Sequence, residues 1–553
     1  MYTATTMPIP RRDVLRSALA AIPVLELDWD SFPTGSAAEA PDQFDAVIIG
    51  SGLGGLSCAA AFARQGFKPL VLEQHDKPGG YATAFRRPGG FLFDVSLHST
   101  GAGERNGIRN LISGFPEIKE VEFVPHKVVY RAIFPEHDIR VPARNMPAYL
   151  ETLTKAFPAE AEGIRGLFDG MAALGREIRA YSSAGGKVDM SRMPVDFPNL
   201  VRYSMSTWGQ VMDSSLKDPK LKCIISALWG YFGLPPSKLA SIYYALPTIS
   251  YINEGGYYPR GRSQTISDAF VKLIEERGGK VLLRTRVERI LVENGVATGV
   301  RTADNREYKA RVVVSNANAY DTFRKLLEPT DLLKDYLARM DRFSVSLSAF
   351  QIFLGLKTDL VRKLGITDSE IFYYPDYDAE AAYKGAVEGD ATTPGFCVTL
   401  YDNLFDGYSP KGKNTINIIA LQGFDHWKPY EADYWKGRKA AYRAEKERIA
   451  GILIRQAEKV LLPGLSQAIE VKEIGTPLTN ARYTSNYRGA IYGWDQTVDN
   501  AMPRRVGQTT PIKNLYLAGA WTSPGHGYGT VIQSGLQCFG QIMATWQKAG
   551  KPA

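Results

Sequence analysis

A glycine-rich turn between two short apolar runs constrains this chain more than any other feature of its sequence. Residues 45–49 (DAVII) and 69–73 (PLVLE) have the continuous apolar character of buried parallel strands. Residues 56–66 (LSCAAAFARQG) lie between them and carry the small and apolar side chains of a helix that packs on a sheet. The order strand, helix, strand predicts a βαβ unit in an α/β protein.

The turn itself has the spacing of a dinucleotide-binding site. Gly50, Gly52 and Gly55 form the pattern GxGxxG, which allows a tight turn, a close approach of a pyrophosphate and close packing of helix on strand. Gly54, in the same turn, is also predicted to contact the cofactor. Glu73 ends the second strand, where a carboxylate accepts hydrogen bonds from ribose hydroxyls. The helix amino terminus then faces the phosphates, so we predict dinucleotide binding rather than a purely structural glycine turn.

Composition limits the class of protein. The chain has 553 residues, of which 44% are hydrophobic and 22% charged, and this fits a folded protein with more than one substructure. No apolar run reaches the roughly 18 residues that a membrane span needs. The net charge of +8 comes from scattered basic residues, which predicts a solvated surface and no nucleic-acid partner. The 4 cysteines and 6 histidines lack metal-ligand spacing, so neither a disulfide framework nor a metal site is predicted.

Residues 1–40 form a separate tail, for which two interpretations stay open. Arg11 and Arg12 precede a short apolar stretch, and this combination resembles a twin-arginine export signal, which implies a periplasmic location. Pro10 stands where such signals carry Ser or Thr, and Glu26 follows the apolar stretch closely. The alternative is a disordered tail or a helix on a membrane surface, which implies a cytoplasmic or peripheral membrane protein.

The residues after Glu73 distinguish FAD from NAD. The chain continues into a loop with the glycine pair Gly79-Gly80 and many backbone donors, whereas an NAD-binding fold would more often enter another helix. Residues 75–94 (HDKPGGYATAFRRPGGFLFD) resemble the FAD-binding segment of the phytoene desaturase, carotenoid isomerase and retinol saturase family of flavoproteins. This resemblance implies that FAD is the cofactor and that Gly79 and Gly80 contact it.

The same family closes its FAD site with a segment similar to residues 514–546. This segment predicts a strand, a glycine-rich loop and an amphipathic helix that begins near Val531. The resemblance implies cofactor contacts at five positions, namely Gly519, Ala520, Gly529, Thr530 and Val531. Ala520 replaces the acid that many related flavoproteins use there, and we expect Gly529 to allow a close approach of the backbone to the flavin.

Residues 255–302 connect the two ends of the predicted site. They predict a helix, a strand and a hairpin that turns at Asn294-Gly295. They also resemble the unit that packs against the adenine in the family, and Val287 matches the position whose backbone contacts the adenine there. Arg262 departs from the family pattern, which usually has a glycine at that point.

Together these segments predict a discontinuous Rossmann-type FAD-binding domain, as in glutathione-reductase-like flavoproteins, with an inserted α+β substrate domain. The FAD-binding domain is predicted to comprise residues 41–115, 245–330 and 470–553. The substrate or membrane-facing domain is predicted to comprise residues 116–244 and 331–469.

An aromatic stretch crosses the end of the first substrate segment. Residues 221–252 form a nearly unbroken apolar run, whose length suits a buried or interfacial helix rather than a membrane span. Trp229 and Phe232 lie in this run. Core packing and the wall of a lipid tunnel or membrane-facing entrance are both open interpretations.

His98 is the candidate catalytic residue. It lies in FDVSLHSTG, which is similar to a pattern that retinol saturases carry, although Ser96 stands in place of a glycine. A structural histidine is the alternative interpretation. The resemblance implies an enzyme that desaturates, saturates or isomerises carbon-carbon double bonds of a carotenoid, retinoid or other isoprenoid lipid. Its expected partners are a hydrophobic small molecule and a peripheral membrane surface, and the oligomeric state stays open.

Two other classes of function share the predicted cofactor. A flavin amine oxidase has the same dinucleotide fold, and a non-catalytic FAD carrier would need only the binding site. The usual GGR loop of the amine oxidases is replaced here by Gly79-Gly80-Tyr81, which favours the first class.

Overall fold

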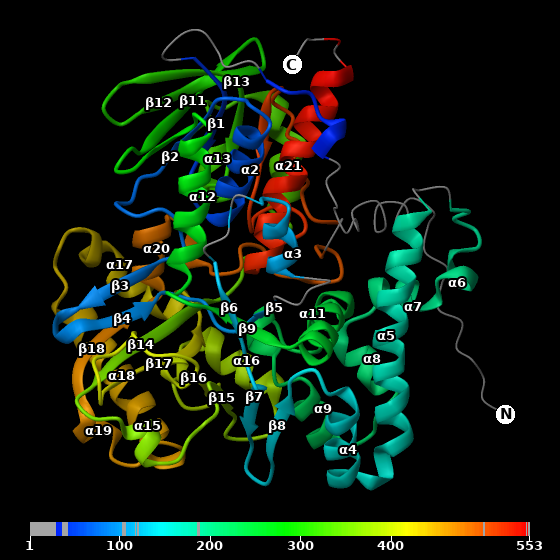
Figure 1. Ribbon diagram of the computed structural model, residues 1–553, viewed down its shortest axis with the longest axis vertical. Coiled ribbons are helices and arrows are strands. Elements are labelled where there is room, and N and C mark those ends of the chain that lie inside the picture. The colour runs from blue at the N-terminus through cyan, green and yellow to red at the C-terminus, as the bar shows by residue number, and fades with distance from the viewer. Residues whose placement is uncertain are drawn as a thin grey trace.

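The computed structural model describes residues 29–35, 43–101, 107–116, 118, 121–184, 188–501, 504–548 and 550. The predicted export segment with Arg11 and Arg12 lies outside these residues. Two seven-stranded sheets organise the described part of the chain, one in the upper half of Figure 1 and one in the lower half. The first sheet supplies the predicted dinucleotide-binding unit.

Five strands of the first sheet are parallel, and an antiparallel hairpin extends it. Its path is β10 (Lys280–Leu282), β2 (Pro69–Leu72), β1 (Gln43–Ile49), β13 (Glu307–Ser315), β12 (Val296–Thr302) and β11 (Val287–Glu293), with β19 (Leu515–Leu517) beside β13. The predicted strands at 45–49 and 69–73 are therefore confirmed, as is the hairpin at Asn294-Gly295.

Helices cover both faces of this sheet because its central strands are apolar on both sides. In β1, Ala46 and Ile48 face one layer, whereas Val47 and Ile49 face the other. The first layer consists of α2 (Leu53–Arg64), α12 (Gln264–Glu276) and α21 (Tyr528–Lys548), with α3 (Ile108–Ser113) against α21. The second layer contains α13 (Ala319–Arg324) and α14 (Lys334–Met340).

The second sheet is mixed and carries its own two helical layers. Its order is β18 (Ile469–Gly475), β14 (Ser348–Leu356), β17 (Asn414–Gln422), β16 (Phe396–Thr399), β15 (Glu370–Tyr373), β7 (Val128–Ile133) and β8 (Asp138–Pro142). One face packs on α15 (Leu360–Lys363), α17 (Lys428–Trp435), α18 (Ala440–Val460), α19 (Leu465–Ala468) and α20 (Pro477–Thr484).

Its other side packs on the helices that lie at the lower right of Figure 1 and on α16. These are α4 (Met146–Ala156), α5 (Ala161–Ser183), α6 (Met193–Asp196), α7 (Pro198–Met205), α8 (Trp208–Asp213), α9 (Pro219–Ile225), α10 (Trp229–Phe232), α11 (Ser241–Glu254) and α16 (Ala379–Glu388). Two small sheets link the halves, one of β3 (Ala84–Arg87) with β4 (Phe91–Asp94), the other of β5 (Thr100–Gly101), β9 (Gly256–Pro259) and β6 (Phe123–Pro125).

The prediction of a single helix over the aromatic stretch is wrong. Residues 221–252 are divided among α9, α10 and α11. Gly233 ends α10 with a positive φ of 77°, and two prolines follow at 235 and 236, where a helix cannot continue. Trp229 and Phe232 are buried, which excludes a membrane-facing position for these two side chains.

The domain division stays a prediction, and two of its boundaries do not coincide with ends of elements. The predicted boundary between 244 and 245 falls inside α11. Strand β18 spans the predicted boundary at 470 and pairs with β14 of the second sheet. Neither predicted boundary falls on a glycine or proline: the Gly255-Gly256 pair comes about ten residues after the first boundary, where α11 ends.

The structure explains how Arg262 can stand where the family pattern usually has a glycine. Arg262 adopts a φ of 73°, the left-handed conformation that glycine adopts without strain. Its guanidinium is buried, stacks on the ring of Tyr408 at 3.5 Å, and donates to Leu92 O at 2.9 Å and to Thr415 Oγ1 at 3.0 Å. These contacts compensate for the strained backbone and fasten β9 to the second sheet.

The amino- and carboxyl-terminal parts of the first sheet meet where α2 crosses α21. A side chain at Gly535 would place its Cβ 2.1 Å from Gly54 O and 2.2 Å from Ser57 Oγ. We therefore expect Gly535→Ala to lower the free energy of unfolding by about 1–3 kcal/mol, because a backbone carbonyl cannot yield to an added methyl group. The measurement is the midpoint of urea unfolding of the holoprotein.

Gly166→Ala is the matched control, because it also lies inside a helix but an added Cβ there meets no atom within 4 Å. We expect it to raise stability by about 0.5–1 kcal/mol through better helix propensity. An unchanged midpoint for Gly535→Ala would contradict the close helix crossing.

Candidate active site

Four parallel strands end at the same edge of the first sheet, and the candidate site begins there. Gly50 follows β1, Glu73 follows β2, Asn316 follows β13, and Gly519 comes two residues after β19. The backbone ties these ends together, since Asn316 N donates to Ile49 O at 2.9 Å and Ala518 N donates to Ser315 O at 2.9 Å. A cavity of about 1430 Å³ extends from this edge to the second sheet. This is where open α/β sheets bind their ligands.

The glycine turn has no room for side chains. Gly50 has a φ of 91°, which favours glycine. A Cβ at Gly52 would lie 2.7 Å from Asn316 Nδ2, and one at Gly54 would lie 2.8 Å from the Cα of Gly519. At Gly55 it would lie 2.3 Å from Gly50 O. The four predicted glycines therefore form a bare backbone surface at the start of α2, as a pyrophosphate requires.

Glu73 is buried beside this turn and is already hydrogen-bonded. Its Oε2 accepts from Ser51 N at 2.8 Å and from Ser51 Oγ at 2.6 Å, and its Oε1 accepts from His75 N at 2.8 Å. Thr285 N donates to Glu73 O at 2.7 Å, which brings the start of β11 next to it. Glu73 also lines the cavity, so it holds the turn and borders the space where we expect the ribose. Val287 lines the same cavity, and its contact with the adenine stays a prediction.

The second glycine pair folds back onto the first. Gly79 N donates to Ser51 O at 2.9 Å, and the φ values of Gly79 and Gly80 are 121° and 60°. A Cβ at Gly79 would lie 2.3 Å from Ala82 O. The structure therefore brings both predicted glycines to the cavity wall beside the GxGxxG turn.

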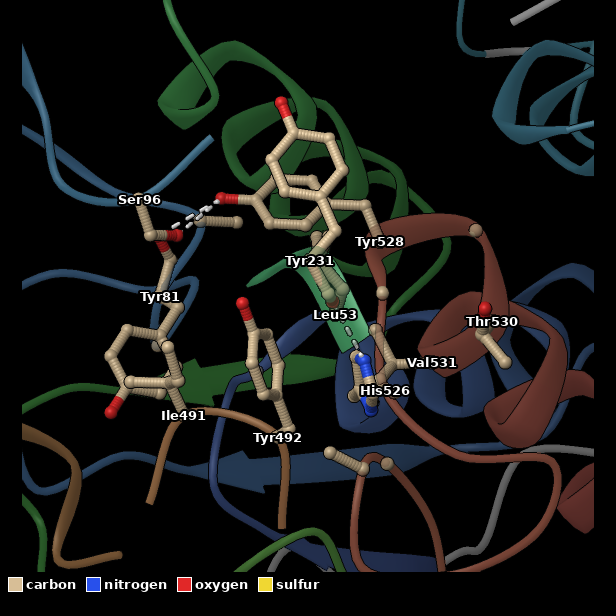
Figure 2. Close-up of a pocket in the computed structure, with 18 of the residues that line it drawn as sticks. Leu53, Tyr81, Ser96, Tyr231, Ile491, Tyr492, His526, Tyr528, Thr530 and Val531 are labelled. Carbon is tan, nitrogen blue, oxygen red and sulfur yellow. Dashed lines mark hydrogen bonds between the residues drawn. The ribbon is translucent and has the colours of Figure 1, made fainter. Parts of the chain in front are cut away.

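The carboxyl-terminal segment completes the predicted FAD-binding site. Gly519 has a φ of 94°, and Ala520, Thr530 and Val531 line the cavity. Helix α21 begins at Tyr528, three residues before the predicted start, and Figure 2 shows Thr530 and Val531 in its first turn. The amides of that turn have no acceptor within the helix and give this end a partial positive charge.

The expected approach of the Gly529 backbone to the flavin stays a prediction, and the protein itself leaves room for a side chain at this position. A Cβ there would lie 3.8 Å from Ile108 N and from Leu111 Cδ1, which is ordinary contact. The surrounding protein therefore does not require glycine at this position. The backbone constraint lies instead at Gly525 and Gly527, whose φ values are 133° and 104°.

A buried arginine, Arg505, lies behind this loop, and no sequence pattern predicted its position. Arg505 Nη2 donates to Ala520 O at 2.7 Å and to Trp494 O at 3.0 Å, and thereby joins two loops at the cavity. Burial lowers the pKa of Arg505 to about 10, so the side chain still carries its charge at neutral pH. Burial, and then the charge of Arg505, lowers the pKa of His526 well below its usual range, so His526 is neutral.

Aromatic side chains form the part of the cavity away from the glycines. Figure 2 shows Tyr81, Tyr231, Tyr492 and Tyr528 gathered around one space, with His526 beside Tyr492. Tyr528 OH donates to Tyr81 O at 3.0 Å, and Tyr492 OH donates to Gly230 O at 2.7 Å. Burial raises the pKa of Tyr81 to about 12, so its phenol stays neutral. The rings thus present mainly apolar surface to a ligand.

Further apolar residues extend this wall towards the second sheet. They are Trp229, Phe232, Ile249, Phe372, Phe396 and Leu421. Trp229 and Phe232 are buried, as core packing predicts, and they also line the cavity. That this wall borders a lipid substrate stays a prediction.

His98 lies in this wall next to a buried acid that sequence reasoning missed. His98 Nδ1 is 3.1 Å from Glu370 Oε1, and Tyr231 OH donates to the same oxygen. Cys397 Sγ lies 3.9 Å from His98 Nδ1. Glu370 opens β15 at the junction between the polar residues 367–369 and the apolar residues 371–373, so its neighbours in the sequence gave no clear sign that it is buried.

These features define an FAD-dependent oxidoreductase. The glycine turns fit a pyrophosphate, the acid at the end of β2 fits a ribose, and the free amides of α21 fit the electron-rich edge of a flavin. The chain belongs to the family described as flavin containing amine oxidoreductase, whose family model matches residues 53–542.

Similarity to curated proteins confirms the resemblance expected from the sequence. The chain is 28% identical over 523 residues to the all-trans-retinol 13,14-reductase of Danio rerio, with 87% of this chain and 83% of that protein covered. It is 27% identical over 545 residues to the chloroplastic prolycopene isomerase of Daucus carota, with 96% and 84% covered.

Solved structures show the same fold. A putrescine oxidase bound to putrescine superposes with a TM-score of 0.60 at 14% identity, and the match covers 91% of this chain and 99% of that one. The predicted FAD-binding fold with an added substrate region is thereby confirmed. Among the residues that the structure describes, no helix combines the length and apolar character needed to cross a bilayer.

Glu73→Ala tests the ribose end of the site. We expect it to weaken FAD binding by about 1–3 kcal/mol, because the ribose hydroxyls lose a charged acceptor and the Ser51 donors lose their partner. The measurement is a fluorescence titration of the apoprotein with FAD. Glu276→Ala, which removes an exposed acid in the last turn of α12, should leave the affinity unchanged. Equal affinity of the parent protein and Glu73→Ala would refute the assigned role.

Proposed function

We propose that this oxidoreductase acts on carbon-carbon double bonds of an isoprenoid lipid such as a carotenoid or retinoid, by saturation, desaturation or cis-trans isomerisation. The observation that carries the proposal is the aromatic cavity that continues from the FAD cradle to the second sheet. The names of the relatives, a retinol reductase and prolycopene isomerases, support the same substrate class.

The chain contributes binding, orientation and exclusion of water. Bound FAD supplies hydride exchange with an activated carbon. The apolar rings bury a polyene by the hydrophobic effect, and most tyrosine hydroxyls around them are already engaged by backbone carbonyls. The first-turn amides of α21 stabilise negative charge at the cofactor without an acidic side chain.

Amine oxidation is the alternative that the fold permits. An ammonium group needs an acceptor in the cavity, and Glu370 is the buried carboxylate beside the aromatic wall. His98 and Tyr231 both occupy its Oε1, and Glu370 does not line the cavity. This arrangement favours an apolar substrate over an amine.

An anaerobic screen of the holoprotein separates these functions. The panel contains all-trans-retinol, a series of carotenoids, and aliphatic amines, each tested with oxidised and with reduced cofactor and analysed by mass spectrometry. We expect a polyene product whose mass changes by two hydrogens, or an isomer of unchanged mass. Amine-dependent release of peroxide without any polyene product would contradict the proposal.

Gly230 offers a way to fill the cavity without disturbing the fold. It lines the cavity in α10, and a Cβ there would meet only Leu421 Cδ1 at 3.9 Å. We expect Gly230→Phe to abolish polyene turnover while FAD stays bound, because the ring occupies the substrate volume. Gly230→Ala is the control and should retain turnover. Loss of FAD from Gly230→Phe would show instead that this region holds the cofactor.

Access from a membrane surface is part of the proposal. Arg176 and Arg179 are exposed on α5 and also line the cavity, where they would face anionic headgroups. We expect the variant with both changed to Gln to bind phosphatidylglycerol vesicles less tightly by roughly 1 kcal/mol per residue in sedimentation assays. Phosphatidylcholine vesicles are the control. Equal binding of the variant and the parent to the anionic vesicles would count against this route.

A further inference from the structure

Four side chains from separate elements meet at the wall of the cavity near the second sheet. His98 follows β4, Tyr231 lies in α10, Glu370 begins β15, and Cys397 lies in β16. The side chain of Glu370 is 1% exposed and that of His98 is 18% exposed, so the acid lies behind the imidazole. His98 lines the cavity, whereas Glu370 does not.

Glu370 determines how His98 presents its ring. The contact of 3.1 Å joins Glu370 Oε1 to Nδ1, so a proton on Nδ1 is held by the carboxylate. Nε2 is then the ring nitrogen left for a ligand.

The other titratable groups of the aromatic wall are less suited to give up a proton. Burial raises the pKa of Tyr81 to about 12 and raises those of Tyr492 and Tyr528 further. His526 is neutral, since burial and Arg505 lower its pKa. His98 is the wall residue whose imidazole is paired with a carboxylate.

We propose that His98 is the proton donor to the polyene and that Glu370 is the positioning residue that orients its ring. This inference rests on the proposed function and adds the proton that the reaction needs. It also assigns a role to Tyr231, whose hydroxyl donates to the same carboxylate oxygen and fixes its orientation.

The step balances for saturation of a double bond. One carbon accepts a hydride from the reduced cofactor, and the π electron pair forms a new C–H bond at the other carbon with the proton of His98 Nε2. The double bond is reduced by two electrons and the cofactor is oxidised by two. His98 is left as a neutral imidazole and takes a new proton from water. Desaturation runs through the same positions in reverse.

Cys397 completes the pocket as a neutral thiol. Burial, and then the charge of Glu370, raises the pKa of Cys397 well above its usual value. Its Sγ, His98 and Glu370 place their ligand atoms within 4.8 Å of one another, which a transition metal could bridge. A metal there would occupy the imidazole, so metal binding and proton donation by His98 exclude each other.

The test compares single turnovers of dithionite-reduced holoenzyme with all-trans-retinol, or with the polyene of the screen that reacts fastest. In Glu370→Gln we expect the rate of cofactor reoxidation to fall by about 10²-fold, with FAD occupancy, reduction potential and substrate KM unchanged. His98→Asn should lose a similar factor, and the double variant should be no slower than the slower single variant, because the two residues act as one unit.

Asp368→Asn is the matched control, because it removes a buried carboxylate two residues away that pairs with Arg140 instead. It should react at the parent rate. A second measurement needs no substrate. NMR of protein labelled with ¹⁵N-histidine reports which ring nitrogen of His98 carries the proton, and the His98 signal is identified by its loss in His98→Asn. The parent should show a protonated Nδ1, and Glu370→Gln should not hold that tautomer.

The outcomes separate this inference from the proposed function. A parent enzyme that converts no polyene refutes the proposed function and the proton transfer with it. A parent that converts polyenes while Glu370→Gln is equally fast, or has the same His98 tautomer, overturns the inference alone. One equivalent of metal in the purified holoprotein that is lost in Cys397→Ser also overturns it, in favour of a metal site.

Discussion

The close approach of three backbones at Gly54, Gly519 and Gly535 holds the rest of the structure in place. A side chain at Gly54 would clash with the backbone of Gly519, and a side chain at Gly535 would clash with the carbonyl oxygen of Gly54. Helix α2, the loop after β19 and helix α21 therefore meet with no side chains between them. The glycine turn predicted to bind the phosphates leads into α2, and the first turn of α21 lines the same cavity, so this contact fixes the distance between the two ends of the predicted cofactor site.

The second sheet supplies part of the apolar wall of the cavity, where we propose that the substrate binds. Its strand β15 places Phe372 against the cavity and Glu370 behind His98, and the short helix α10 closes the wall with Trp229 and Phe232. Arg505 connects the two sides, since it donates to the backbone of both the Trp494 and the Ala520 loops. The polar cradle and the apolar wall are thus two halves of one cavity built on different sheets.

The local parts of this arrangement could be predicted from the sequence, because short patterns determine them. The GxGxxG turn, Glu73 and the Asn294-Gly295 hairpin each depend on a few neighbouring residues, and the structure has them as expected. The start of α21 was misplaced by three residues because Tyr528, Gly529 and Thr530 have no strong helix signal.

The long-range parts could not be predicted in the same way. Asn316, Arg505 and Glu370 each act through a partner more than 10 residues away or on another sheet, and nothing in their immediate neighbours specifies that partner. Residues 221–252 were misjudged because an apolar run indicates burial without indicating where a helix ends. His98 was identified by resemblance alone, and its acid became visible only when β15 was placed beside it.

The discontinuous first sheet has a consequence for how a new chain acquires its cofactor. The βαβ unit leaves the ribosome first, but β1 lies between β2 and β13, and Gln43 pairs with Lys309. β19 and α21 are synthesised near the end. For most of translation, therefore, the glycine turn exists without the backbone that faces it, and the apolar surface of α2 that α21 will cover is exposed. The complete cofactor site therefore forms only after β19 and α21 have been synthesised.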